Sequence, residues 1–171
     1  MIPQYYIAAL PDLSLDFYQN LEKLYELECY PEIRLPFHVT LFYLGELNKK
    51  QEEKVFNWFD EKKKIPRIEA RIKGVKSFNK DEKPFVYFLD LDSLELETLN
   101  KEFSIFSDIH KDSFSFIPHI SLFFPKFNTK QENNHFLEKI FKDMNTISLK
   151  KIYLGSVIDN VTHIHKSIPC T

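Results

Sequence analysis

The chain has 171 residues, of which 43% are hydrophobic and 17 are phenylalanine. This composition is ample for the packed core of one domain. The net charge of −2 argues against sequence-independent binding of duplex nucleic acid, which requires a basic surface. Cys29 and Cys170 share no motif spacing, so a disulfide framework is not expected. There is no apolar stretch of membrane-spanning length and no signal-peptide pattern, so we expect a cytoplasmic protein without membrane contact.

Hydrophobic periodicity and turn signals predict alternating strands and helices. In chain order, the first half is expected to contain a strand at 4–10, a helix at 14–28, a strand at 36–44, a helix at 48–61 and a strand at 67–78. The second half repeats this order with a strand at 84–91, a helix at 94–109, a strand at 116–124, a helix at 129–144 and a strand at 147–158. A last strand at 161–168 is expected to close a hairpin, because Asp159-Asn160 suits a tight turn.

One short phrase occurs twice, as FHVTLFY at residues 37–43 and as PHISLFF at residues 118–124, 81 positions apart. The same spacing relates further residues: Gly74 to Gly155, and Tyr6 to Tyr87. We therefore expect a single domain built by internal duplication, with one lobe at about residues 1–80 and the other at about 81–171. A pseudo-two-fold axis between the lobes would bring the two phrases together across a groove.

Each phrase carries a histidine followed two residues later by a hydroxyl. Side chains two apart in a strand project from one face, so His38 lies beside Thr40, and His119 beside Ser121. Imidazoles titrate near neutral pH, so one can take a proton from an attacking oxygen while the other protonates a leaving oxygen. The hydroxyls can donate hydrogen bonds to the non-bridging oxygens of a phosphodiester. This chemistry requires no metal.

The two phrases resemble the paired His-x-Thr/Ser-x motifs of the 2H phosphoesterase superfamily, and their flanks resemble those of its LigT-like (2′-5′ RNA ligase-like) cyclic phosphodiesterases. The resemblance covers essentially the whole chain. It implies a bilobal α+β fold in which two antiparallel sheets flank a central groove, with helices outside. It also implies cofactor-free, metal-independent hydrolysis of 2′,3′-cyclic phosphates, 2′-5′ linkages or cyclic nucleotides. His38 and His119 would be the catalytic pair, and Thr40 and Ser121 would bind the phosphate.

The chain departs from that family where a basic residue often follows each motif. It has Phe42 after the first motif and Phe123-Phe124 after the second, and Lys126 is the nearest basic residue to the second. By strand alternation, Phe42 and Phe123 share the faces of their histidines, where they would either stack a base or belong to the core. Phe42, Phe123, Lys126 and Tyr6 are therefore the candidate substrate-binding residues.

Other readings remain open. His163 and His165 alternate on the last expected strand and are a possible metal pair, but no further ligand has a supporting spacing, so a solvent-facing or structural role is favoured. His110 and His135 receive no role. The substrate is expected to be a small nucleotide or oligonucleotide. The alternatives are a viral or phage-type enzyme that degrades immune messengers, such as 2′-5′ oligoadenylates or cyclic oligonucleotides, and a module that binds a nucleotide or RNA end without catalysis.

Overall fold

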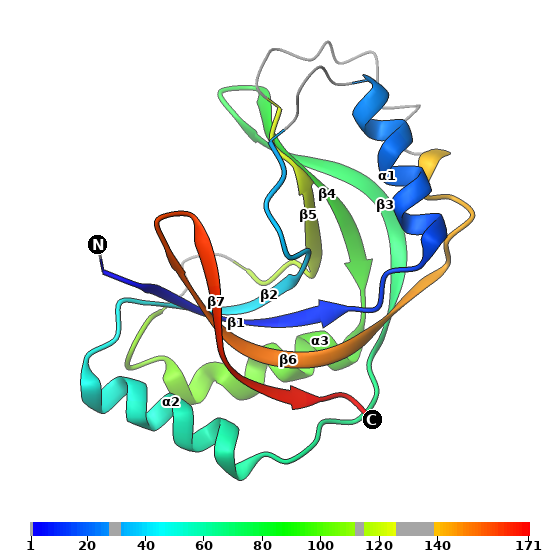
Figure 1. Ribbon diagram of the computed structural model, residues 1–171. Helices are drawn as coiled ribbons and strands as arrows, with labels where there is room; N and C mark the ends of the chain where they lie inside the picture. The colour runs from blue at the N-terminus through cyan, green and yellow to red at the C-terminus, as the bar shows by residue number, and fades with distance from the viewer. Residues whose placement is uncertain (1, 28–31, 112–114, 126–138) are drawn as a thin grey trace.

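The computed structural model describes residues 2–27, 32–111, 115–125 and 139–171 (Figure 1). The strands in this part of the chain are β1 (Gln4–Pro11), β2 (Val39–Gly45), β3 (Glu69–Lys80), β4 (Lys83–Asp92), β5 (His119–Phe123), β6 (Thr146–Ile158) and β7 (Val161–Pro169). The helices are α1 (Leu15–Leu27), α2 (Lys49–Glu61) and α3 (Leu94–Glu102), and a 3-10 turn, η1 (Phe103–Phe106), follows α3. Every expected strand is present, with small shifts at its ends.

The helix starts follow local chemistry. Asn48 caps α2: its side-chain oxygen accepts from the backbone N–H of Gln51 at 3.0 Å, and the Gln51 side chain accepts from the Asn48 N–H at 3.0 Å. The helix expected at 94–109 is shorter, because α3 passes into η1 after Glu102. The tighter turn brings residues three apart into line, which places Phe103 and Phe106 together in the core. The helix expected at 129–144 lies mostly outside the described residues.

The strands form one antiparallel sheet in the order β1-β2-β5-β4-β3-β6-β7, and β1 also pairs with β6. The α+β architecture is confirmed, but the two expected sheets are joined by short pairings of β2 with β5 and of β3 with β6. The halves also exchange strands: β3 pairs with β4 of the second half, and β6 pairs with β1 of the first. This pairing pattern maps onto itself when the halves are interchanged, as a duplicated fold requires. The division into lobes near residue 80 stays a prediction.

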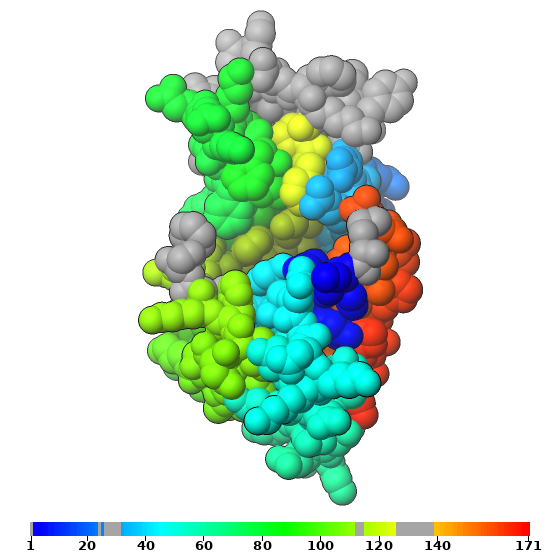
Figure 2. Space-filling model, turned by 90° about the vertical axis from the view of Figure 1, so that its left-hand side faces the viewer, coloured from blue at the N-terminus to red at the C-terminus, as the bar shows by residue number. Residues whose placement is uncertain are grey.

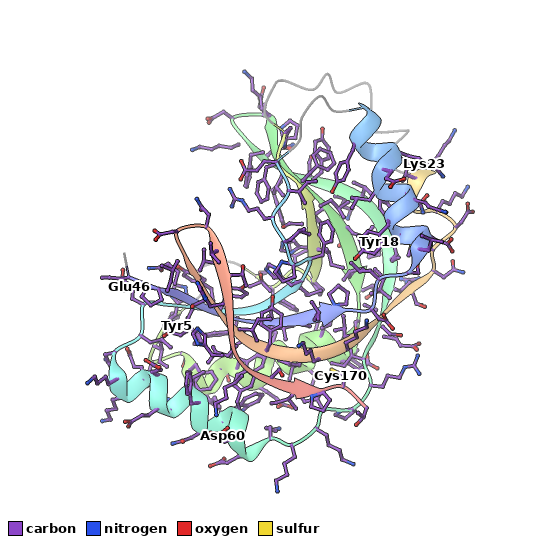
Figure 3. The ribbon with its side chains drawn as sticks, in the orientation of Figure 1. Tyr5, Tyr18, Lys23, Glu46, Asp60 and Cys170 are labelled. Carbon is purple, nitrogen blue, oxygen red and sulfur yellow. The ribbon has the colours of Figure 1, made fainter. Side chains whose placement is uncertain are left out.

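The helices cover the outside of this sheet, with α2 and α3 side by side below β1 and β6 in Figure 1. On β1, Tyr5, Ile7 and Ala9 belong to the large core shared with the helices, whereas Tyr6 and Ala8 belong to a separate small cluster with Tyr153. In Figure 3, Tyr5 lies between β1 and α2, on this helix-covered side. The opposite face of β1 is therefore available to a site. Within the described ranges, no helix combines the length and apolarity needed to cross a membrane.

Candidate active site

The four side chains expected to be functional come together on one face of the β2–β5 ladder. Val39 lies directly opposite Ile120 in this antiparallel pair, and both are fully buried on the helix-covered side. The residues on either side of such a pair face the other way. The register therefore sets His38 beside Ser121 and Thr40 beside His119, which forms a group of two imidazoles and two hydroxyls.

The two imidazoles are oriented in the same manner. His38 Nδ1 lies 2.7 Å from the carbonyl oxygen of Pro36, and His119 Nδ1 lies 2.7 Å from that of Ile117. A carbonyl oxygen only accepts, so each Nδ1 must carry a hydrogen and donate it. Nε2 is then the nitrogen left for proton exchange with a substrate: it accepts in the neutral ring and donates in the charged ring.

The surroundings of the two rings affect their charge differently. Burial lowers the pKa of His38 below its ordinary value, the hydrogen bond to Pro36 opposes this change, and the charge of nearby His119 lowers the pKa further. Burial also lowers the pKa of His119, but here both the Ile117 carbonyl and the carboxylate of Asp90 oppose the change. Both rings therefore lose their proton more readily than an exposed histidine, and only His119 has a carboxylate among these influences.

The expectation that Phe42 and Phe123 share the faces of their histidines is wrong. In the pairing with β1, Phe42 lies opposite Ile7 while Thr40 lies opposite Ala8, so Leu41 is an extra residue. The same bulge occurs at Leu122 in the pairing of β5 with β4, where Phe123 lies opposite Tyr87 and Ser121 opposite Phe88. An extra residue reverses the alternation beyond it.

As a consequence, both phenylalanines turn into the core and cannot stack a base. Phe42 is 7% exposed and lies near Phe103, and Phe123 is 1% exposed and stacks on Tyr87 with 4.8 Å between ring centroids. The next residue along each strand takes the outward place. Tyr43 and Phe124 line a cavity together with His38.

Tyr6 lies at the site, but its expected partner in the repeat, Tyr87, does not. Thr40 and Ser121 are equivalent in the repeat, and they lie opposite Ala8 on β1 and Phe88 on β4. Strands β1 and β4 therefore correspond at a spacing of 80 residues, so Tyr6 corresponds to Val86. The Tyr6 ring stacks on His38 with 5.3 Å between centroids.

The close packing around Tyr6 depends on β6. Gly155 lies opposite Tyr6, and a Cβ atom at this glycine would lie 2.9 Å from Tyr6 Cζ. Tyr153 packs edge-on against both Tyr6 and His38, and burial raises its pKa. The buried hydroxyls of Tyr6 and Tyr153 interact with each other, which also raises the pKa of Tyr153. Two phenols therefore pack against the His38 side of the site.

A cavity of about 470 Å³ opens beside three of the four expected side chains, and His119 is not among its lining residues. Its lining includes His38, Thr40, Ser121 and Tyr6, together with residues 32–37 and the tip of the β6–β7 hairpin. Figure 2 shows the surface hollowed between the β3–β4 hairpin and the β6–β7 hairpin. A larger cavity, of about 690 Å³, shares Leu35, Pro36 and Phe37 with the first but contains none of the expected site residues. The smaller cavity is the better candidate on chemical grounds.

The sequence interpretation missed Arg34, the one lysine or arginine among the described residues that line this cavity. Backbone hydrogen bonds join Glu32 to Phe124 in both directions, which brings the segment before β2 beside the end of β5. The Arg34 guanidinium lies 4.0 Å from the centroid of the Phe124 ring, and its Nε lies 3.0 Å from Glu32. A cation thus stands over the phenylalanine that follows the second motif. Lys126 lies outside the described residues.

His163 and His165 lie away from the cavity. The Ser156 hydroxyl and His165 Nε2 are 2.8 Å apart, and the His165 ring packs near Tyr5 and Phe56. Within the described ranges, no three residues of the metal-binding types gather as a potential metal site. His165 therefore has a structural environment. His135 lies outside the described residues.

No family model and no curated protein matches the chain. Its structure is similar to that of Escherichia coli LigT (TM-score 0.69, 13% identity, 100% of this chain and 99% of LigT covered). TT0787 of Thermus thermophilus (0.66, 15% identity, 97% of each chain) and Usb1 of Kluyveromyces marxianus (0.53, 10%, 97% of each) are also similar. LigT has in addition been solved with 3′-AMP, ATP and NADP+. The resemblance expected from the two histidine phrases is thus confirmed at the level of the fold: this chain is built as the LigT-like phosphoesterases are, from end to end.

Proposed function

We propose that the protein is a metal-independent phosphodiesterase that hydrolyses a 2′,3′-cyclic, 2′-5′ or cyclic-oligonucleotide linkage. One observation carries this proposal: His38, His119, Thr40 and Ser121 form one group on the β2–β5 ladder, with each imidazole held through Nδ1. Two such imidazoles can act as general base and general acid on a single phosphodiester. The two hydroxyls would stabilise the charge that develops on its non-bridging oxygens.

We further propose a small nucleotide or oligonucleotide as the substrate. The likeness to LigT, whose structures contain 3′-AMP, ATP or NADP+, supports this class. The cavity also offers groups suited to a nucleotide: the Arg34 guanidinium for phosphate oxygens and the rings of Tyr6, Tyr43 and Phe124 for apolar contact. Tyr6 thus keeps its proposed role in substrate binding.

A substrate panel tests the activity directly. The intact protein is incubated, with and without EDTA, with a 2′,3′-cyclic mononucleotide, a 2′-5′-linked triadenylate and cyclic di- and trinucleotides, and products are resolved by chromatography. We expect cleavage of at least one substrate at a rate that EDTA leaves unchanged. Loss of turnover in EDTA and its recovery with zinc would overturn the metal-independent mechanism.

The same panel separates the alternatives. Preferred cleavage of the triadenylate or of the cyclic oligonucleotides would support a role in degrading immune messengers, and cleavage of the mononucleotide alone would exclude it. A protein that binds these ligands in calorimetry, yet forms no product after long incubation, would be a binding module. The presence of both histidines and both hydroxyls favours catalysis, because binding alone needs no matched acid and base.

Arg34→Gln is expected to raise KM roughly threefold to tenfold while kcat changes little, since an exposed cation that contacts the bound phosphate contributes about equally to ground state and transition state. Arg67→Gln is a matched control: both side chains are 66% exposed and ion-paired with a glutamate, but Arg67 does not line the cavity. Steady-state kinetics at low and high salt give KM and kcat for both variants. Equal KM values for the two variants would remove Arg34 from the binding site.

A further inference from the structure

Asp90 is the one buried carboxylate in the described part of the chain, with 3% of its surface exposed. It lies on β4 directly opposite His119 on β5, so both side chains project from the same face of the sheet. The residue two positions earlier, Phe88, lies opposite Ser121 and packs on the His119 ring. A buried acid thus stands next to one of the two imidazoles, although the activity as proposed assigns it no task.

The other half of the fold has no counterpart of this acid. Ala8 lies opposite Thr40 as Phe88 lies opposite Ser121, so the position on β1 that corresponds to Asp90 is Leu10. The small cluster on this side is formed by Tyr6, Ala8 and Tyr153, with Leu10 packed against it. The duplicated fold is therefore symmetric in its histidines and hydroxyls but not in the charge beside them.

Two lysines of β3 form ion pairs with the Asp90 carboxylate, whose buried Oδ2 has no hydrogen bond of regular geometry. Lys76 Nζ lies 2.6 Å and Lys73 Nζ lies 3.6 Å from Asp90 Oδ2. A buried carboxylate without a partner would be costly, and these cations offset that cost. They also make the field at His119 depend on the balance between Asp90 and its two lysines.

The remaining titratable neighbours do not restore the symmetry. His119 is faced by Asp90 from β4 and by His38 from β2, and Lys73 and Lys76 of β3 act on it through Asp90. His38 is packed against Tyr6 of β1 and Tyr153 of β6, and it faces His119 of β5. Arg34 and Glu32 line the same cavity, but they are exposed and paired with each other. Among the described residues, a buried negative charge therefore lies beside His119 only.

We propose that Asp90 is a positioning residue that makes His119 the proton donor and His38 the proton acceptor of the reaction; this rests on the proposed phosphodiesterase activity. Water attacks phosphorus, and one of its protons passes to Nε2 of neutral His38 as the new phosphorus–oxygen bond forms. The bond from phosphorus to the leaving oxygen breaks, and that oxygen takes the proton from Nε2 of charged His119. Exchange with solvent then returns each ring to its starting state.

The test measures the two histidines without relying on turnover. Titration of the free, 15N-labelled protein by NMR is expected to give a higher pKa for His119 than for His38. Asp90→Asn is expected to lower the pKa of His119 by about one unit, because an opposite charge that favours the imidazolium is lost. Lys76→Gln is expected to shift it in the other direction, because less of the Asp90 charge is neutralised while Lys73 still holds the carboxylate.

Asp92→Asn is the matched control, since Asp92 lies two residues further along β4, is exposed and pairs with Arg71. This variant should leave the pKa values of His38 and His119 within about 0.2 of those in the unchanged protein. With a substrate that the protein cleaves, the basic limb of the pH profile of kcat/KM should move with the His119 pKa in each variant.

A His38 pKa above that of His119, or His119 pKa shifts of equal sign in Asp90→Asn and Lys76→Gln, would overturn this assignment. If Asp90→Asn fails to fold, Lys76→Gln alone still tests the proposal: a rise in the His119 pKa supports it and a fall contradicts it. Absence of turnover with the expected titrations would refute the proposed function and leave the electrostatic asymmetry standing.

Discussion

His38→Ala and His119→Ala are each expected to lower kcat by roughly 10²- to 10⁴-fold, the usual contribution of a positioned general acid or base. Each substitution removes one of the two Nε2 atoms that exchange protons with the substrate. Because acid and base act in the same step, the double variant should lose far less than the product of the single losses. Initial rates on the best substrate of the panel measure all three.

Two controls accompany these variants. His163→Ala alters an exposed histidine of β7 outside the cavity and should keep full activity. Thermal unfolding of each variant checks that the fold survives. We expect little loss of stability, because both imidazoles are only partly buried. Undiminished turnover in either His38→Ala or His119→Ala would refute two-histidine catalysis.

An activated substrate separates the two roles. A nucleotide ester of p-nitrophenol has a leaving group that is stable as an anion and needs no proton. His119→Ala should therefore recover much of its rate on this substrate, whereas His38→Ala should remain slow, because water still needs a base. The reverse result would exchange the roles of acid and base, and equal losses would show that neither proton transfer is assigned correctly.

Thr40→Val and Ser121→Ala are expected to lower kcat by about 10²-fold each, the lower end of the effect of removing one donor from a site that stabilises developing negative charge. Valine keeps the shape of threonine at residue 40, so packing against Ala8 on β1 should survive. KM should change less than kcat, because the charge on the non-bridging oxygens grows as the transition state forms. Steady-state kinetics on one substrate give both constants.

The conservative variant Thr40→Ser retains a hydroxyl on the same face and should recover most of the lost rate. Ser167→Ala, at an exposed position of β7, is the matched control and should behave as the unchanged protein. If Thr40→Val or Ser121→Ala leaves kcat intact, the hydroxyls belong to the structure of the strands rather than to the phosphate site.

Local chemistry allowed much of the fold to be predicted. The strands and the first helix follow from apolar periodicity, and α2 begins after Asn48 because the capping side chain and its partner Gln51 are only three residues apart. The tight turn at Asp159-Asn160 is present, with both residues at positive φ. The repeat also predicted that His38 and His119 would meet. Each of these inferences needs only neighbours in sequence or a comparison of the chain with itself.

Strand register and contacts between distant segments required the tertiary structure. The bulges at Leu41 and Leu122 reverse the alternation of side chains between the two faces of the sheet, so Phe42 and Phe123 lie in the core. Neither bulge position carries a glycine that would indicate an extra residue in the sequence. Likewise, nothing in the sequence near Arg34 indicates that it lies over Phe124, 90 positions away.

The sequence alone therefore determined which residue types the site contains: two histidine–hydroxyl pairs on strands that repeat. Only the tertiary structure decided their environment, above all the pairing that sets Asp90 opposite His119 and Leu10 at the equivalent position on the other side. The physical reason is that alternation and capping act over a few residues, whereas a strand pairing is selected by the total burial and hydrogen bonding of segments far apart in the chain.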